Sequence, residues 1–217
     1  IGAVADDGVD GASASESFTP EEVDRRPCPE SRFECVTITV PRDHADPVGE
    51  TWEVQYAIQE ATGERIGTFV TITGGPGSGG IWSADGYTDV MSPLITEHYD
   101  IVFLNQRGSG PFQPLRCDEA AAGFYRSPLD TGAPDAADAI EATLQTFVDG
   151  CLAEGDIDVD DLAYYGTDQA AEDLELVRRH LGADQLALYG ESYGTQFVQT
   201  YAAAHPDRVS VLIVDGV

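Results

Sequence analysis

Lysine is absent from this sequence, and all 11 basic residues are arginine. P-loop NTPases, Schiff-base enzymes and Ser-Lys hydrolases each need an ε-amine, so these three classes are excluded. The 39 acidic residues give a formal net charge of -28. A protein of this charge repels the phosphates of nucleic acids and of anionic lipids. We therefore expect neither a nucleic acid nor a membrane surface as a partner.

Metal-binding spacings and long apolar runs are also missing. The four cysteines form two separated pairs, Cys28 with Cys35 and Cys117 with Cys151, with no CxxC spacing or nearby histidine cluster. This pattern argues against a metal site, and nothing else calls for a cofactor. We expect two disulfides and a secreted or cell-envelope location rather than four reduced core cysteines. No run approaches the ~20 apolar residues that span a bilayer, so we expect no membrane insertion.

The composition indicates one globular unit preceded by a leader. With 217 residues, 42% of them hydrophobic, the chain can bury one sizeable core. Residues 1–27 are rich in Gly, Ala, Ser, Asp and Glu, which predicts a flexible acidic leader. The globular part is expected over residues 28–217. Because the first residue is Ile1 and not Met, we expect that a signal peptide or other residues precede it.

Six strand-like runs are separated by turns and helical patterns. They span 35–40, 52–59, 67–73, 99–104, 186–189 and 209–214. The later runs are continuously apolar, which is typical of parallel strands covered by helices on both faces. The first two alternate, and the turn-rich segment between them predicts an antiparallel pair at the sheet edge.

Three helices are predicted between and after these strands. They span 168–181, about 136–152, and from Ser192 to about residue 204. In the first, apolar residues repeat along one face, Thr167 is expected to cap the start, and Gly182 the end. Two strands followed by alternating strands and helices predict an open α/β sheet that is mostly parallel, with helices on both faces.

The clearest chemical motif is GESYG, Gly190 to Gly194, between an apolar strand and a helix. Two glycines at this spacing permit a tight turn that lifts Ser192 above the sheet as a nucleophile. The backbone N–H of Tyr193 would then lie at a helix N-terminus, where it can stabilise an oxyanion. A glycine-flanked structural turn is the alternative for so short a motif.

A second motif, TGGPGSGG, follows the strand at 67–73. In an α/β hydrolase the loop after the third strand supplies the other oxyanion donor, and we expect the N–H of Gly75 in this role. A dinucleotide fingerprint is the competing interpretation, because Gly75, Gly77 and Gly80 satisfy GxGxxG. Pro76 lacks an N–H, and the acidic residue expected after the next strand is replaced by Asn105, so the oxyanion interpretation is favoured.

A third motif, NQRGSG at residues 105–110, taken alone predicts a plain turn with a structural arginine. The ordered set is more specific: GGPGSGG, NQRGSG, two cysteines, DLELVRRHLG, LYGESYGT and VLIVDGV. From about residue 28 to 217 it resembles the tripeptidyl and prolyl aminopeptidase branch of the α/β hydrolases. Two residues depart from the family pattern. Thr73 stands where the prolyl branch has His, and Asn105 stands where Asp is usual. Cys117 and Cys151 match the tripeptidyl branch.

The resemblance implies a serine exopeptidase that releases residues or short peptides from the amino end of peptides, usually in a secreted or envelope-associated setting. Ser192 matches the family nucleophile, and Gly75 and Tyr193 match its oxyanion positions. A hydrolase of small carboxylic esters and an inactive hydrolase-like binding module stay open as alternatives. Comparing the rates on aminoacyl amides and on short esters would distinguish the peptidase from the esterase. Labelling of Ser192 by a fluorophosphonate would distinguish either enzyme from the inactive module.

The base and the acid of a triad follow the serine on this fold. After Ser192 the only histidine is His205, about 20 Å along the same helix at 1.5 Å per residue, which is too far for a base. Asp215 ends the sixth strand but matches a turn in this family. We therefore expect an incomplete sheet and a C-terminal part, a cleaved fragment or the rest of the chain, that carries the catalytic His and Asp.

Overall fold

A mixed seven-stranded sheet runs through the computed structural model, which describes residues 18–110, 117–128, 132 and 134–217. The strands are β1 (Glu22–Pro27), β2 (Glu34–Pro41), β3 (Thr51–Gln59), β4 (Gly67–Ile72), β5 (Tyr99–Asn105), β6 (Leu186–Glu191) and β7 (Val209–Asp215). Their order in the sheet is β1-β2-β3-β5-β4-β6-β7. β5, β4, β6 and β7 are parallel to one another, and β1, β2 and β3 add antiparallel pairings.

The six predicted strands correspond to β2 through β7, and β1 was not predicted. Its sequence EVDRRP is polar, and all of its residues but one are exposed, so it carries no alternating apolar signal. Pairing with β2 alone makes it a strand. The expected leader over 1–27 was therefore wrong at its C-terminal end, and the rest, residues 1–17, lies outside the described part. The predicted parallel part is formed by β5, β4, β6 and β7, and β1 extends the predicted antiparallel edge by one strand.

The helices are α1 (Gly80–Val90), α2 (Pro93–His98), α3 (Asp118–Arg126), α4 (Ala136–Gly155), α5 (Thr167–His180) and α6 (Tyr193–Ala204), with short turns η2 (Val159–Tyr165) and η3 (Pro206–Arg208). α4, α5 and α6 confirm the three predictions. Thr167 is the first residue of α5 and not its cap, which is Gly166. Gly182, at φ +64°, follows the end of α5 as expected.

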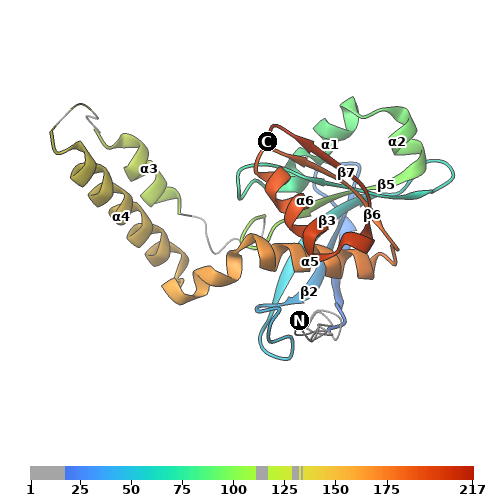
Figure 1. The fold of residues 1–217 in the computed structure, drawn as a ribbon, viewed down its shortest axis with the longest axis horizontal. Helices are drawn as coiled ribbons and strands as arrows, with labels where there is room; N and C mark the ends of the chain where they lie inside the picture. The colour runs from blue at the N-terminus through green and yellow to red at the C-terminus, as the bar shows by residue number, and fades with distance from the viewer. Residues whose placement is uncertain (1–17, 111–116, 129–131, 133) are drawn as a thin grey trace, which may run out of the picture.

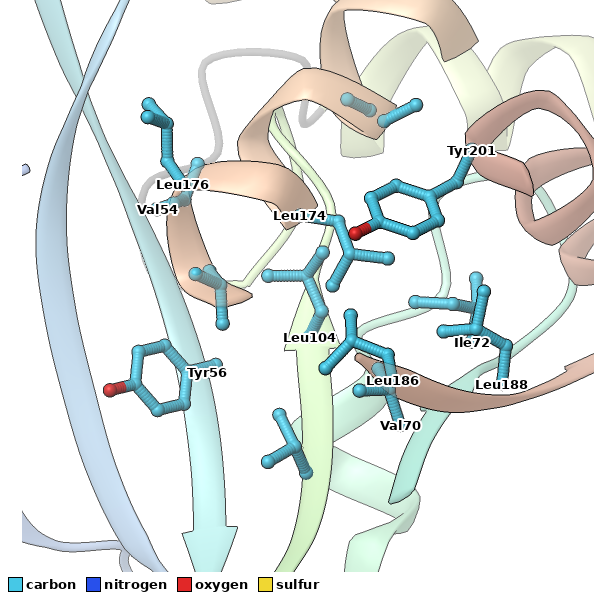
Figure 2. Packing of buried hydrophobic residues seen from close by; sticks show 14 of the residues in the cluster. Val54, Tyr56, Val70, Ile72, Leu104, Leu174, Leu176, Leu186, Leu188 and Tyr201 are labelled. Atoms are coloured by element: carbon cyan, nitrogen blue, oxygen red, sulfur yellow. The ribbon is translucent and has the colours of Figure 1, made fainter. Parts of the chain in front are cut away.

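Helices cover both faces of the sheet (Figure 1), with α5 and α6 on one face and α1 and α2 on the other. Alternate residues of each strand therefore enter different cores. In β5, Val102 and Leu104 join the larger core under α5 and α6, which Figure 2 shows. Ile101 and Phe103 face the smaller core beside α1. This period of two explains why the central strands are apolar throughout.

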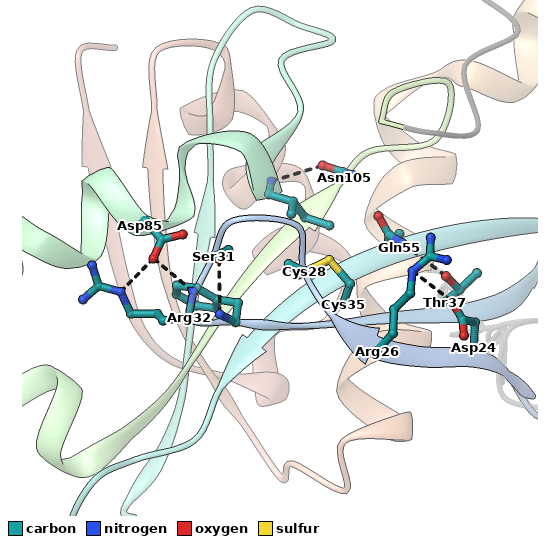
Figure 3. The surroundings of a disulfide bond; sticks show 12 residues. Asp24, Arg26, Cys28, Ser31, Arg32, Cys35, Thr37, Gln55, Asp85 and Asn105 are labelled. Carbon is teal, nitrogen blue, oxygen red and sulfur yellow. Dashed lines mark hydrogen bonds and ion pairs between the residues drawn. A yellow bond between two sulfur atoms is a disulfide. The ribbon is translucent and has the colours of Figure 1, made fainter.

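Both predicted disulfides are present. Cys28–Cys35 joins the residue after β1 to β2 within the smaller core (Figure 3), and Cys117–Cys151 joins the start of α3 to α4. α3 and α4 form a hairpin that projects away from the sheet (Figure 1) and buries none of its residues fully. No helix among the described residues has the length and apolar character needed to cross a membrane.

Helix α1 begins in close contact with the end of β5. A Cβ added at Gly80 would lie 2.4 Å from the carbonyl oxygen of Leu104, so only glycine fits there. The Asn105 side chain accepts a hydrogen bond from the N–H of Ile81 at 3.1 Å (Figure 3). Asn105 thus satisfies one of the free N–H groups of the first turn, a role normally filled by a capping residue.

We predict that Gly80→Ala lowers the free energy of unfolding by about 1–3 kcal/mol, because the added methyl overlaps a backbone atom that cannot move alone. Gly86→Ala in the same helix is the matched control: its Cβ would meet nothing within 4 Å. That change should stabilise the protein by up to about 1 kcal/mol through helix propensity. Urea unfolding of both variants checks this, and equal stabilities would contradict it.

Candidate active site

Ser192 occupies the turn that joins β6 to α6. Its backbone has φ +55° and ψ -123°, a region that side-chain-bearing residues rarely adopt. Two groups of contacts hold this conformation. The Ser192 N–H donates to the carbonyl of Asp215 at 2.9 Å, and the Ser192 carbonyl accepts from the N–H and hydroxyl of Thr195 at 3.0 and 2.7 Å. The tight turn between strand and helix that the sequence predicted is therefore present, and the nucleophile role of Ser192 stays a prediction.

Two glycines make this turn possible. A Cβ at Gly194 would lie 2.1 Å from the carbonyl oxygen of Ile72, at the end of β4, and one at Gly190 would lie 2.3 Å from the carbonyl oxygen of Gly194. Both distances are far below van der Waals contact. The helix can therefore start directly against the central strand only because both positions lack a side chain.

The glycine-rich loop after β4 lies against the serine. A Cβ at Gly74 would lie 2.8 Å from the Ser192 Cβ and 3.1 Å from its Oγ. Gly75 has φ +121°, which favours glycine. Both glycines and Ser192 line one cavity of about 490 Å³. The structure thus brings Ser192 and Gly75 together, as the sequence predicted, and places Tyr193 at the first position of α6.

The Tyr193 side chain is fixed from a second helix. Its hydroxyl lies 2.5 Å from the hydroxyl of Thr167, at the start of α5. Sequence reasoning assigned Thr167 to a helix cap and missed this contact, because the two residues are 26 positions apart. The contact links the residue after the nucleophile to the N-terminal turn of α5.

Arg107 of the NQRGSG motif is a structural residue. All five of its N–H groups donate: two to the carboxylate of Asp173, and the others to the backbone carbonyls of Pro41, Arg42 and Tyr164. Its side chain and that of Asp173 are each 1% exposed. Because a buried charge is tolerated only when it is paired and fully hydrogen-bonded, this arginine holds the loop after β5 against α5.

The four histidines of the chain all bond to groups other than the serine. His44 bonds Asp173 in the buried cluster, His98 the carbonyl of Glu64, and His180 the carboxylate of Glu22. His205 bonds Glu172 at 2.9 Å. Within the described part of the chain no histidine is hydrogen-bonded to Ser192.

Among the described residues, Asp215 supports the serine turn and is hydrogen-bonded to no histidine. Its carbonyl accepts the Ser192 N–H, and its carboxylate accepts the Tyr189 hydroxyl at 2.9 Å. Burial, and then the nearby Asp215 carboxylate, raise the pKa of Tyr189, so this hydroxyl stays protonated and donates. Both contacts hold Asp215 beside Ser192.

Glu191, the variable residue before the serine, was not singled out from the sequence. Its carboxylate accepts a hydrogen bond from the Tyr87 hydroxyl on α1, and both residues line the cavity of Ser192. The only available signal was a charged residue inside a glycine-flanked motif, which does not reveal a partner 104 positions away.

We predict that the His205–Glu172 pair stabilises the fold mainly at low pH. The hydrogen bond to Glu172 raises the pKa of His205 above its ordinary value of 6.5. A raised pKa means that the contribution is complete below the unfolded pKa and is lost as pH rises through the folded pKa. The stability difference between wild type and His205→Gln should therefore be larger at about pH 5.5 than at about pH 8.5.

Urea unfolding at the two pH values measures this difference. His98→Gln is the control, because among the described residues its ring contacts a backbone carbonyl and no carboxylate. If His205→Gln lowers the free energy of unfolding by the same amount at both pH values, the prediction is contradicted.

Comparison with known proteins agrees with this geometry. A family model described as the alpha/beta hydrolase fold matches residues 67–217. The serine protease Hip1 of Mycobacterium tuberculosis is 32% identical over 185 residues, which cover 84% of this chain and 35% of that protein. The tripeptidyl aminopeptidase of Streptomyces lividans is 30% identical over 196 residues, which cover 85% of this chain and 35% of that protein. Carboxylesterase B of M. tuberculosis is 30% identical over 153 residues, which cover 67% of this chain and 28% of that protein.

The chain thus spans about a third of the length of the first two relatives. The family match covers the strands β4 to β7, which carry the glycine-rich loop and the serine turn. This match excludes the dinucleotide-binding interpretation of GxGxxG. The family match, the strand order and the serine turn together show that the chain belongs to the α/β-hydrolase family.

Proposed function

We propose that this chain carries the nucleophilic half of a serine exopeptidase that releases residues or short peptides from the amino end of peptides. The observation that carries the proposal is Ser192, held at φ +55° against a glycine-rich loop that lines the same cavity. The likeness to a tripeptidyl aminopeptidase supports the peptide substrate. No metal or other cofactor is needed for this chemistry.

In the proposed reaction the Ser192 Oγ attacks the carbonyl carbon of the scissile amide. A histidine takes the hydroxyl proton and returns it to the leaving amine, which leaves an acyl group on Ser192. The N–H groups of Gly75 and Tyr193 receive the negative oxygen of the tetrahedral intermediate, and the N-terminus of α6 adds a favourable dipole. Water then releases the acyl group from the serine.

The histidine and its orienting acid are proposed to come from a C-terminal part that is a partner of this chain or its continuation. Two observations support this. The four histidines present bond elsewhere, and β7 lies at the edge of the sheet with residues Val211 to Val214 each 41–43% exposed. Apolar residues on both faces of an edge strand are expected to be covered, and further strands and helices would do so.

We also propose a secreted or cell-envelope location. The two disulfides support it, because such bonds persist in oxidising compartments. The formal charge of -28 is compatible with a solvated acidic surface and argues against binding to nucleic acid.

A second function, hydrolysis of small carboxylic esters, is favoured by one observation. Carboxylesterase B is as similar in identity as the aminopeptidase, although over a shorter part of the chain. The same nucleophile and oxyanion groups serve both reactions, so the difference lies in the substrate that the complete cavity accepts.

We predict that the complete enzyme is labelled by a fluorophosphonate at Ser192 and hydrolyses peptide nitroanilides with a free amino end. Ser192→Ala should abolish labelling and lower kcat/KM by at least about 10⁴-fold, because the nucleophile is lost. Ser83→Ala is the matched control, since this serine lines the same cavity but bonds only the Gly80 carbonyl within the described residues.

Three outcomes would count against the proposal. Labelling that persists in Ser192→Ala would assign the nucleophile to another residue. Activity on short esters alone would favour the esterase. An unlabelled, inactive complete protein would favour the inactive binding module.

A further inference from the structure

Among the described residues that line the cavity beside Ser192, Glu191 alone is charged. The lining consists of glycines, hydroxyl-bearing residues, two aromatic residues and Glu191. No arginine or histidine is among the described residues that line it, and no ion pair to Glu191 is present in that part of the chain. The Glu191 carboxylate is partly buried, and it accepts from the Tyr87 hydroxyl. The hydroxyl orients the carboxylate but leaves its charge in place.

Two aromatic side chains of α1 complete this part of the cavity. Tyr87 is partly buried and packs on Phe103, with ring centroids 5.8 Å apart. Trp82 is 95% exposed, so nearly all of its indole ring is available for contact. An aromatic face and a carboxylate both attract a cation: the ring through its quadrupole, the carboxylate through charge-assisted hydrogen bonds.

We propose that Glu191, Trp82 and Tyr87 form a subsite for a positively charged group of the substrate, an ammonium or a guanidinium. This inference rests on the proposed peptidase function and specifies which substrates that function selects. Glu191 determines specificity and takes no part in the bond-breaking steps. Its Tyr87 contact keeps the carboxylate in one orientation, so the cation enters a preformed site.

The position of the subsite limits where the cation can lie. Glu191 precedes the nucleophile directly, and consecutive Cα atoms are about 3.8 Å apart. Because Glu191 and Ser192 also line the same cavity, the proposal places the cation on the substrate residue next to the scissile bond. In a peptide two groups meet this condition: the free α-amine of an amino-terminal residue and the side chain of lysine or arginine. Both present the same chemistry to the carboxylate.

The test uses the complete enzyme and four peptide nitroanilides. Lysine or its uncharged analogue norleucine precedes the scissile bond, and the amino end is free or acetylated. Glu191→Gln keeps the side-chain shape and can still accept from Tyr87, but it removes the charge. We expect kcat/KM to fall about 10- to 100-fold for substrates that place a cation in the subsite and less than about threefold for acetylated norleucine.

The pattern of losses identifies the source of the cation. If kcat/KM falls for the substrates that contain lysine, the subsite binds the side chain. If it falls for the substrates with a free amino end, the subsite binds the peptide terminus. Trp82→Ala should reduce the same preference several-fold. Glu97→Gln, which removes an equal charge on α2 outside the cavity, should change none of the four rates. Equal losses on all four substrates, or none on any, would overturn the subsite.

Failure of the peptidase proposal would be seen separately. Fluorophosphonate labelling of each variant shows whether the nucleophile is intact. Calorimetric binding of lysinamide, norleucinamide and their acetylated forms needs no bond cleavage. If the enzyme hydrolyses no amide but binds the cationic amides at least tenfold more tightly than acetylated norleucinamide, with this preference lost in Glu191→Gln, the subsite stands and the peptidase does not. Equal binding of all four amides would overturn the subsite.

Discussion

The close backbone contact between β4 and the start of α6 is the constraint on which the site depends. Gly194 lies so near the carbonyl of Ile72 that any side chain would overlap it, and a side chain at Gly74 would crowd the Cβ of Ser192. These contacts place Ser192 at the end of the central strands and hold the glycine-rich loop at its side. The positive φ of Ser192 follows from the same crowding, because the chain must reverse within one residue.

A buried polar cluster supports this arrangement from the antiparallel side of the sheet. Arg107 and Asp173 neutralise each other, His44 adds a hydrogen bond, and backbone carbonyls take the remaining arginine donors. The cluster fixes the loop after β5 and the helix α5. The first residue of α5, Thr167, then contacts the Tyr193 hydroxyl, so the cluster and the nucleophile turn share one rigid support.

Sequence patterns predicted the elements that have strong local signals. The apolar runs of β4 to β7 and the apolar stripe of α5 were found because each buries a face with a regular period. β1 was missed because its polar residues become a strand only through pairing with β2. α1 was missed because its apolar signal is weak: its fully buried positions are Gly80, Ala84 and Thr88, and the larger Ile81 and Tyr87 are only partly buried against the smaller core.

The sequence by itself determined the tight serine turn, the two disulfide pairs and the α/β architecture, since each depends on residues whose type and order carry the physical requirement. Only the tertiary structure decided which distant groups meet: Tyr87 with Glu191, Thr167 with Tyr193, and Arg107 with Asp173. Such contacts join segments separated by 26 to 104 positions, and they form only when the sheet order brings those segments together. No local propensity or spacing encodes a distance between them.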